Sequence, residues 1–100
     1  MDEAKKAELE AKYETIETIE TVKGEAAFKL LDRRQRNRYL EQVAQNKIGE
    51  AADFACLATV VLPDRATFES WIDSRPGISM QCMRKLAAFN RLGGNAEGEG

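Results

Sequence analysis

The sequence contains no histidine, no glycine-rich phosphate loop and only two cysteines. Without a histidine base, the usual activation of a serine or cysteine nucleophile is excluded, although a lysine base or a carboxylate pair stays open. Two cysteines without histidine partners are also too few for a zinc site. We therefore expect a protein that is not an enzyme, holds no cofactor or metal, and acts by binding a partner.

A strong excess of one charge sign is missing as well. Lys and Arg number 15 against 17 Asp and Glu, which gives a net charge of -2 and an isoelectric point near 5.2. This balance weighs against a general nucleic-acid-binding surface. Acidic and basic blocks alternate along the chain, which suits subunits that attract one another but is also typical of solvated helix faces.

Long hydrophobic runs are absent. No window reaches the roughly 18 apolar residues of a membrane span, and the first residues lack the apolar segment of a secretory signal. We expect a cytoplasmic protein with no membrane association. Cys56 and Cys82 lie among apolar residues, which favours two reduced, buried side chains over a bridge between them.

The remaining composition suffices for one core, because 100 residues that are 43% hydrophobic can form a single domain without disulfides or metals. Residues 1–14 are rich in helix formers but carry only Leu9 and Tyr13 as sizeable apolar residues, so they predict a helical arm. The β-branched run 15–22 favours a strand, with helix left open. A turn at Lys23 and Gly24 leads into a second strand, which predicts a hairpin over 15–31.

Four helices are expected after the hairpin, over 33–46, 48–62, 64–73 and 76–92. Two aspartates favour helix starts: Asp32, with Gln35 completing a capping box, and Asp64 directly after Pro63. The first of these helices should bury a stripe formed by Tyr39, Leu40, Val43 and Ala44.

The helix over 48–62 is apolar on nearly every side, which predicts a place at the centre of a bundle or under a subunit contact. Pro63 should stop it, and Gly93 is a candidate left-handed cap for the last helix. The predicted fold class is mainly α with a small N-terminal β-hairpin (α+β). A four-helix-type domain over 15–94 follows the arm, and a disordered tail is expected over 95–100.

Two groups of residues are candidate partner contacts. Phe68, Trp71 and Ile72 share one helix face, where core packing is the ordinary alternative to a binding hot spot. Arg34 and Arg38 share a polar face within the arginine-rich segment 32–38. They fit a solvated helix start better than a contact with an acidic partner or with nucleic acid.

Several short motifs occur in order along the chain: ELEAKY at 8–13, FKLLDR at 28–33, NRYL at 37–40, VVLPD at 60–64, RPGI at 75–78 and LGG at 92–94. In this order they resemble the small tail assembly chaperones of long-tailed bacteriophages and prophages. Members of that family often have proline just after the second strand, where this chain has Leu31.

The resemblance implies a helical domain with a small β element that self-associates in the cytoplasm of the bacterial host. It would bind the tape measure protein and keep it soluble until the tail tube forms around it. Two alternatives from other classes stay open. One is a small DNA-binding regulator that uses the helix 33–46, and the other is a structural tail or head-tail joining subunit.

Overall fold

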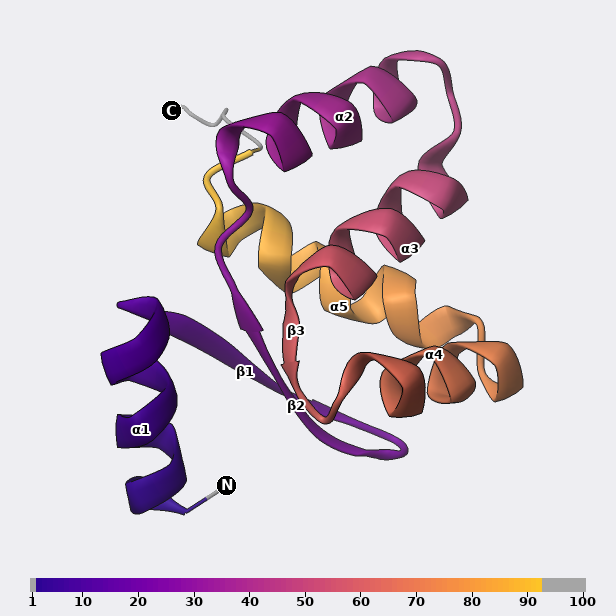
Figure 1. Cartoon of the computed structure of the whole chain (residues 1–100). Coiled ribbons are helices and arrows are strands. Elements are labelled where there is room, and N and C mark those ends of the chain that lie inside the picture. Colours follow the sequence, from indigo (N-terminus) through magenta and orange to yellow (C-terminus); the bar gives the residue numbers. More distant parts are fainter. Residues whose placement is uncertain (1, 93–100) are drawn as a thin grey trace.

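The computed structural model describes residues 2–92, which form five helices and a three-stranded sheet (Figure 1). In chain order the elements are α1 (Glu3–Tyr13), β1 (Ile16–Thr21), β2 (Gly24–Lys29), α2 (Arg33–Ala44), α3 (Ile48–Thr59), β3 (Val60–Leu62), α4 (Arg65–Ser74) and α5 (Gly77–Phe89). The predicted α+β class, mainly helical with a small β element near the N-terminus, is confirmed. The predicted tail over 95–100 lies outside the described residues.

The hairpin is present, and the run over 15–22 is a strand rather than a continued helix. Thr21 pairs with Gly24, so two residues make the turn between β1 and β2. The Thr21 hydroxyl donates to the Gly24 carbonyl over 2.7 Å and accepts from the Lys23 N–H over 3.1 Å. Gly24 has a φ of 140°, a conformation that side-chain-bearing residues rarely adopt. Glycine is therefore required where β2 begins.

A third strand lies where the sequence predicted the end of a helix. The helix expected over 48–62 ends at Thr59, and Val60–Leu62 pairs antiparallel with β2, so the prediction was wrong for its last three residues. Val60 and Val61 favour extended backbone, and Leu62 precedes a proline, which disfavours the α conformation. The free edge of β2 then offers these residues hydrogen-bond partners that a helix interrupted by proline would lack.

The sheet, in the order β1-β2-β3, buries apolar side chains on both faces. Ile19, Ala26 and Phe28 point into the main core, whereas Ile16 and Ala27 meet Leu9 of α1 on the other face. This split follows from the alternation of side chains along a strand. The helices α3, α4 and α5 therefore cover one face, and α1 covers part of the other.

The connection between α1 and β1 is strained. Glu14 has φ 70° and ψ -58°, and the Thr15 N–H donates to the Tyr13 carbonyl over 2.8 Å. These values describe a classic γ-turn, which is rare for a residue with a side chain. Leu9 is the only buried residue of α1. The arm is thus held to the sheet by a small apolar contact and joined to it by a strained turn.

The main core brings together α3, α4, α5 and the sheet. Its two largest fully buried side chains, Phe28 and Phe68, meet edge to face with ring centroids 5.5 Å apart. Alanines on α3 (Ala52 and Ala55) let α5 approach closely, so that Leu86 reaches the same cluster. Burial of these side chains is the main stabilising contribution to the fold.

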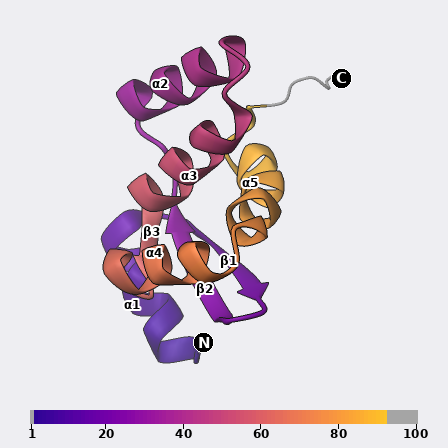
Figure 2. The ribbon, with the colours of Figure 1, turned by 90° about the vertical axis from the view of Figure 1, so that its right-hand side faces the viewer.

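In contrast, α2 lies outermost, and α3 separates it from the sheet and from α4 (Figures 1 and 2). None of its residues is buried, so the predicted stripe was wrong: Leu40 and Ala44 are exposed, and Tyr39 and Val43 are only half-buried. The periodicity was present, but α2 packs mainly against the single neighbour α3. A single neighbouring helix covers only part of the apolar face of α2, so the rest of that face stays exposed.

Helix ends follow local chemistry closely. Asp32 and Gln35 form the predicted capping box of α2, and Asp64 accepts from the Thr67 N–H to cap α4. Two helices end in a residue with left-handed backbone, Asn46 after α2 and Arg91 after α5. The predicted cap Gly93 lies outside the described residues, and Arg91 takes the left-handed conformation two positions earlier.

No helix within 2–92 has the length and apolar character to span a bilayer.

Candidate binding groove

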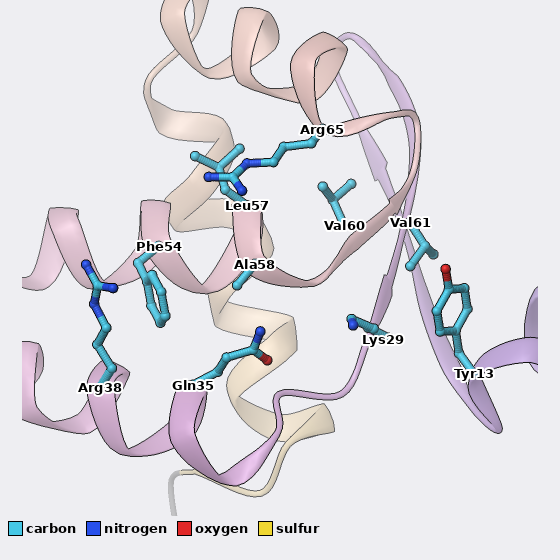
Figure 3. A pocket seen from close by; sticks show the side chains of 10 residues that line it. All are labelled: Tyr13, Lys29, Gln35, Arg38, Phe54, Leu57, Ala58, Val60, Val61 and Arg65. Atoms are coloured by element: carbon cyan, nitrogen blue, oxygen red, sulfur yellow. The ribbon is translucent and has the colours of Figure 1, made fainter.

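A groove of about 680 Å³ opens where α2, α3 and β3 meet (Figure 3). It also receives side chains from α1, β2 and the start of α4. Its lining consists of Tyr13, Lys29, Gln35, Arg38, Phe54, Leu57, Ala58, Val60, Val61 and Arg65. The volume lies within the roughly 300–1,000 Å³ typical of binding sites.

The floor of the groove is apolar and comes from consecutive parts of the chain. Phe54, Leu57 and Ala58 share one face of α3 at the i, i+3, i+4 spacing. Val60 and Val61 of β3 also line the groove, although they lie on opposite faces of the strand, Val60 toward the main core and Val61 toward the cluster around Leu9. All five are half-buried. The opposite face of α3, which includes Ala52 and Cys56, is buried in the core. The nearly uniform apolarity of this segment therefore serves two surfaces, the core and the groove.

The ionisable side chains on the rim are cationic, apart from the phenol of Tyr13. Lys29 comes from β2, Arg38 from α2 and Arg65 from the first residue of α4. The Arg38 guanidinium lies 4.4 Å from the centroid of the Phe54 ring, and the Lys29 ammonium lies 5.7 Å from that of Tyr13. Within residues 2–92, none of the three cations has a carboxylate partner at ion-pair distance. The groove therefore combines apolar side chains on its floor with an exposed lining that is mostly polar and carries unneutralised positive charge.

The two arginines predicted as partner contacts, Arg34 and Arg38, differ in whether they line the groove. Arg38 points over the groove floor, whereas Arg34 does not line the groove. Both arginines border a second, more open hollow on the outer side of α2, together with Asn37, Leu40 and Glu41. That they lie on the same side of α2 agrees with their separation of four residues in the sequence. Among the residues predicted as partner contacts, Arg38 is thus the one that lines the groove.

The aromatic candidates lie mostly in the core. Phe68 is fully buried and Ile72 is 8% exposed, so neither presents a surface to a partner. Trp71 is half-buried and lies against the hairpin, because a Cβ on Gly24 would stand 3.4 Å from its Cη2 atom. The ring also contacts Phe68, with centroids 5.8 Å apart. Packing of the hairpin onto α4 accounts for the position of Trp71.

The cysteines are free, and both are buried. The Cys56 Sγ donates to the Ser79 carbonyl over 3.6 Å. Its hydrogen bond with Cys82 and its burial raise the pKa of the Cys56 thiol far above the ordinary range. The same hydrogen bond lowers the pKa of Cys82, while burial acts against this shift. Because both thiols are buried away from solvent, neither is placed to act as a nucleophile or a metal ligand. These residues act as small core side chains.

The sequence pattern did not mark several of the groove residues as candidates, notably Phe54, Leu57, Val61, Lys29 and Arg65. One signal could have found the floor: a helix that is apolar on nearly every side needs a second apolar neighbour besides the core. The rim had no such signal, because Lys29 and Arg65 are 36 positions apart and meet only through the pairing of β2 with β3. Lone surface cations of this kind are common in any sequence.

Within the described part of the chain, no group of three or more Cys, Asp or Glu residues is arranged to hold a metal ion. Comparisons of the chain with models of known protein families, with curated proteins and with solved structures find no match. The groove is therefore the feature on which a functional assignment depends.

Proposed function

We propose that this protein is a tail assembly chaperone of a long-tailed bacteriophage or prophage that binds the tape measure protein and keeps it soluble during tail assembly. The observation that carries the proposal is the open groove with an apolar floor, formed by α3 and β3 in a chain without histidine. A chaperone that only holds its client needs such a surface and no catalytic group.

The client explains why a groove suits this role. A long, helix-rich protein exposes apolar stripes before it is enclosed, and such stripes aggregate. A groove that accepts the apolar face of a helix covers part of a stripe reversibly. Several chaperone copies on one client would add their modest affinities into stable protection.

Self-association is the second part of the proposal. Tyr39, Ile48, Met80 and Met83 border a shallow hollow of about 260 Å³ between α2, α3 and α5. Ile48 is 48% and Met80 43% exposed, which is high for large apolar side chains. Sedimentation over a wide concentration range should show oligomers, and Met80→Glu should reduce them. A chain that stays monomeric at all concentrations would remove this part of the proposal.

The decisive experiment is co-expression with a fragment of the tape measure protein encoded near this gene. The wild-type chain should recover the fragment in a soluble complex. Phe54→Ser should recover about tenfold less, because it removes the aromatic floor of the groove while the main core is left intact. Leu40→Ser is the matched control, since Leu40 is exposed on α2 outside the groove.

Two results would oppose the assignment. A fragment that is equally soluble alone and does not bind would remove the need for a chaperone. Recovery of the protein from purified virions would point instead to a structural tail or head-tail joining subunit.

A further inference from the structure

We propose that the groove selects one class of occupant, an amphipathic helix that carries acidic side chains beside its apolar stripe. This inference rests on the proposed function, because it specifies the chemistry of the client segment. It stands on three observations: the sign of the charges on the rim, their placement around the floor, and the state of the Arg38 side chain.

The first observation is charge. The lining contains three cations and no aspartate or glutamate, although the whole chain carries a net charge of -2. The positive sign is therefore a local property of this surface. Lys29 and Arg38 lie against aromatic rings, and no carboxylate within residues 2–92 pairs with either of them or with Arg65. A partner with carboxylates would supply the missing opposite charge, and one with lysines would be repelled.

The second observation is placement. Figure 3 shows Arg38 at one side of the floor, Arg65 above it and Lys29 toward the other end, with Phe54, Leu57 and Ala58 between them. A helix about 10 Å wide occupies roughly 420 Å³ per turn, so the groove corresponds to between one and two turns. Apolar residues on that segment would face the floor. Carboxylates on its flanks would then lie near the cations.

The third observation concerns how Arg38 is held. Stacking on Phe54 at 4.4 Å orients the planar guanidinium and leaves its N–H edge available. A carboxylate can accept two parallel hydrogen bonds from such an edge. The Arg38 side chain is therefore already partly ordered in the free protein. Binding of a carboxylate then costs less conformational entropy, which makes the binding tighter.

Two other occupants fit the observations less well. Nucleic acid would meet the cations but has no apolar stripe to cover the floor. An extended peptide could pair with the free edge of β3, but that strand has only three residues and offers few backbone partners. A helix uses both the apolar floor and the cationic rim.

The test measures binding of synthetic peptides of about twenty residues by fluorescence anisotropy. One peptide has leucines at the i, i+3, i+4 spacing flanked by glutamates, and a second replaces those glutamates with lysines. The full-length wild-type chain should bind the glutamate peptide at least tenfold more tightly. Added salt should narrow this difference, since part of the attraction is between exposed charges.

Charge reversal then assigns the preference to the groove. The double substitution R38E/R65E should reverse the order of the two peptides, whereas R34E, on the same helix but outside the groove, should leave it unchanged. Arg34, Arg38 and Arg65 are exposed, so the variants should fold, and circular dichroism checks this.

Each outcome separates this inference from the proposed function. Equal binding of both peptides, or equal loss in R34E and R38E/R65E, would overturn the acidic preference while soluble recovery of the tape measure fragment could still succeed. Tight, salt-sensitive binding of a DNA duplex that competes with the glutamate peptide would also overturn it, in favour of nucleic acid. If the peptide order reverses as expected but no tape measure fragment is recovered, the occupant is an acidic helix from another protein.

Discussion

The helices α2 and α3 have the same length, 12 residues, and lie against each other, yet their surroundings differ greatly. Five residues of α3 are buried, and no residue of α2 is. Both segments show an apolar face in the sequence. The difference arises from the number of neighbours, because α3 contacts α5, α4, β2 and α2, whereas α2 packs mainly against α3. Burial is thus a property of the position in the fold as much as of the helix.

This contrast also explains why α3 keeps an accessible apolar edge. A helix enclosed on one side by a core and on the other by a single exposed helix leaves part of its surface at the edge between them. On α3 that edge carries Phe54, Leu57 and Ala58, which form the groove floor. We expect α3 to belong to the cooperative core and α2 to a more loosely held outer layer.

The largest loss of stability is expected from a substitution in the main core, on which α3 packs. Phe68→Ala removes a fully buried ring that meets Phe28 edge to face, and should lower the free energy of unfolding by about 3–5 kcal/mol. Urea denaturation followed by circular dichroism measures this. Val22→Ala is the control, because Val22 is 69% exposed and its loss should cost less than about 0.5 kcal/mol. Similar losses in the two variants would contradict the assignment of Phe68 to the core.

An intermediate effect is expected at the start of α2. Asp32→Ala breaks the capping box, which should destabilise the helix by about 1 kcal/mol. Because α2 lacks buried residues, the loss should appear as local opening. Native-state hydrogen exchange should show α2 amides exchanging about fivefold faster and α3 amides unchanged.

The conservative variant Asp32→Asn should behave as wild type, because asparagine caps about as well as aspartate. Equal acceleration of exchange in α2 and α3 would mean that the two helices open as one unit.

A pH effect is expected at the contact between the two helices. Burial against α3 raises the pKa of Tyr39 above its ordinary value of 10.0. A raised pKa means that the contribution of Tyr39 to stability is fully present below about pH 10 and is lost as pH rises toward the folded-state pKa.

Ultraviolet titration of a Tyr13→Phe variant should show this shift, since Tyr39 is then the one tyrosine in the chain. In denaturant the pKa should return to its ordinary value. A folded-state pKa at or below 10.0 would indicate that α2 does not pack against α3 as described.

The smallest effect is expected on the outer side of α2. Leu40 is 43% exposed, so Leu40→Ser should change the free energy of unfolding by less than about 0.5 kcal/mol, measured by urea denaturation. A loss above about 1.5 kcal/mol would place Leu40 in a contact between copies. Sedimentation of the variant would then show fewer oligomers than the wild type.

The parts of the fold that were predictable share a local cause. The capping box at Asp32 and the cap at Asp64 depend on residues three positions apart, so the pattern contains both partners of each hydrogen bond. The hairpin was also predicted from a nearby signal, since Gly24 with its positive φ marks the start of β2, although the two turn residues are Val22 and Lys23 rather than Lys23 and Gly24. Such features need no information about distant residues.

The errors share a different cause. The strand β3 was predicted as helix because its partner, β2, lies more than 30 positions earlier in the chain. The stripe of α2 was predicted to be buried because the pattern shows which face is apolar but not whether a second element covers it. Within the candidate site, only Arg38 was anticipated, from its place on a polar face.

The sequence by itself determined that this protein lacks a histidine base, that it forms mostly helices, and where α2 and α4 begin, because each of these depends on composition or on residues a few positions apart. The tertiary structure alone decided that α3 faces a core on one side and a groove on the other. It also decided that Lys29, Arg38 and Arg65 surround that groove. The physical reason is that an apolar helix surface acquires its role only from what packs against it, and those neighbours come from distant parts of the chain.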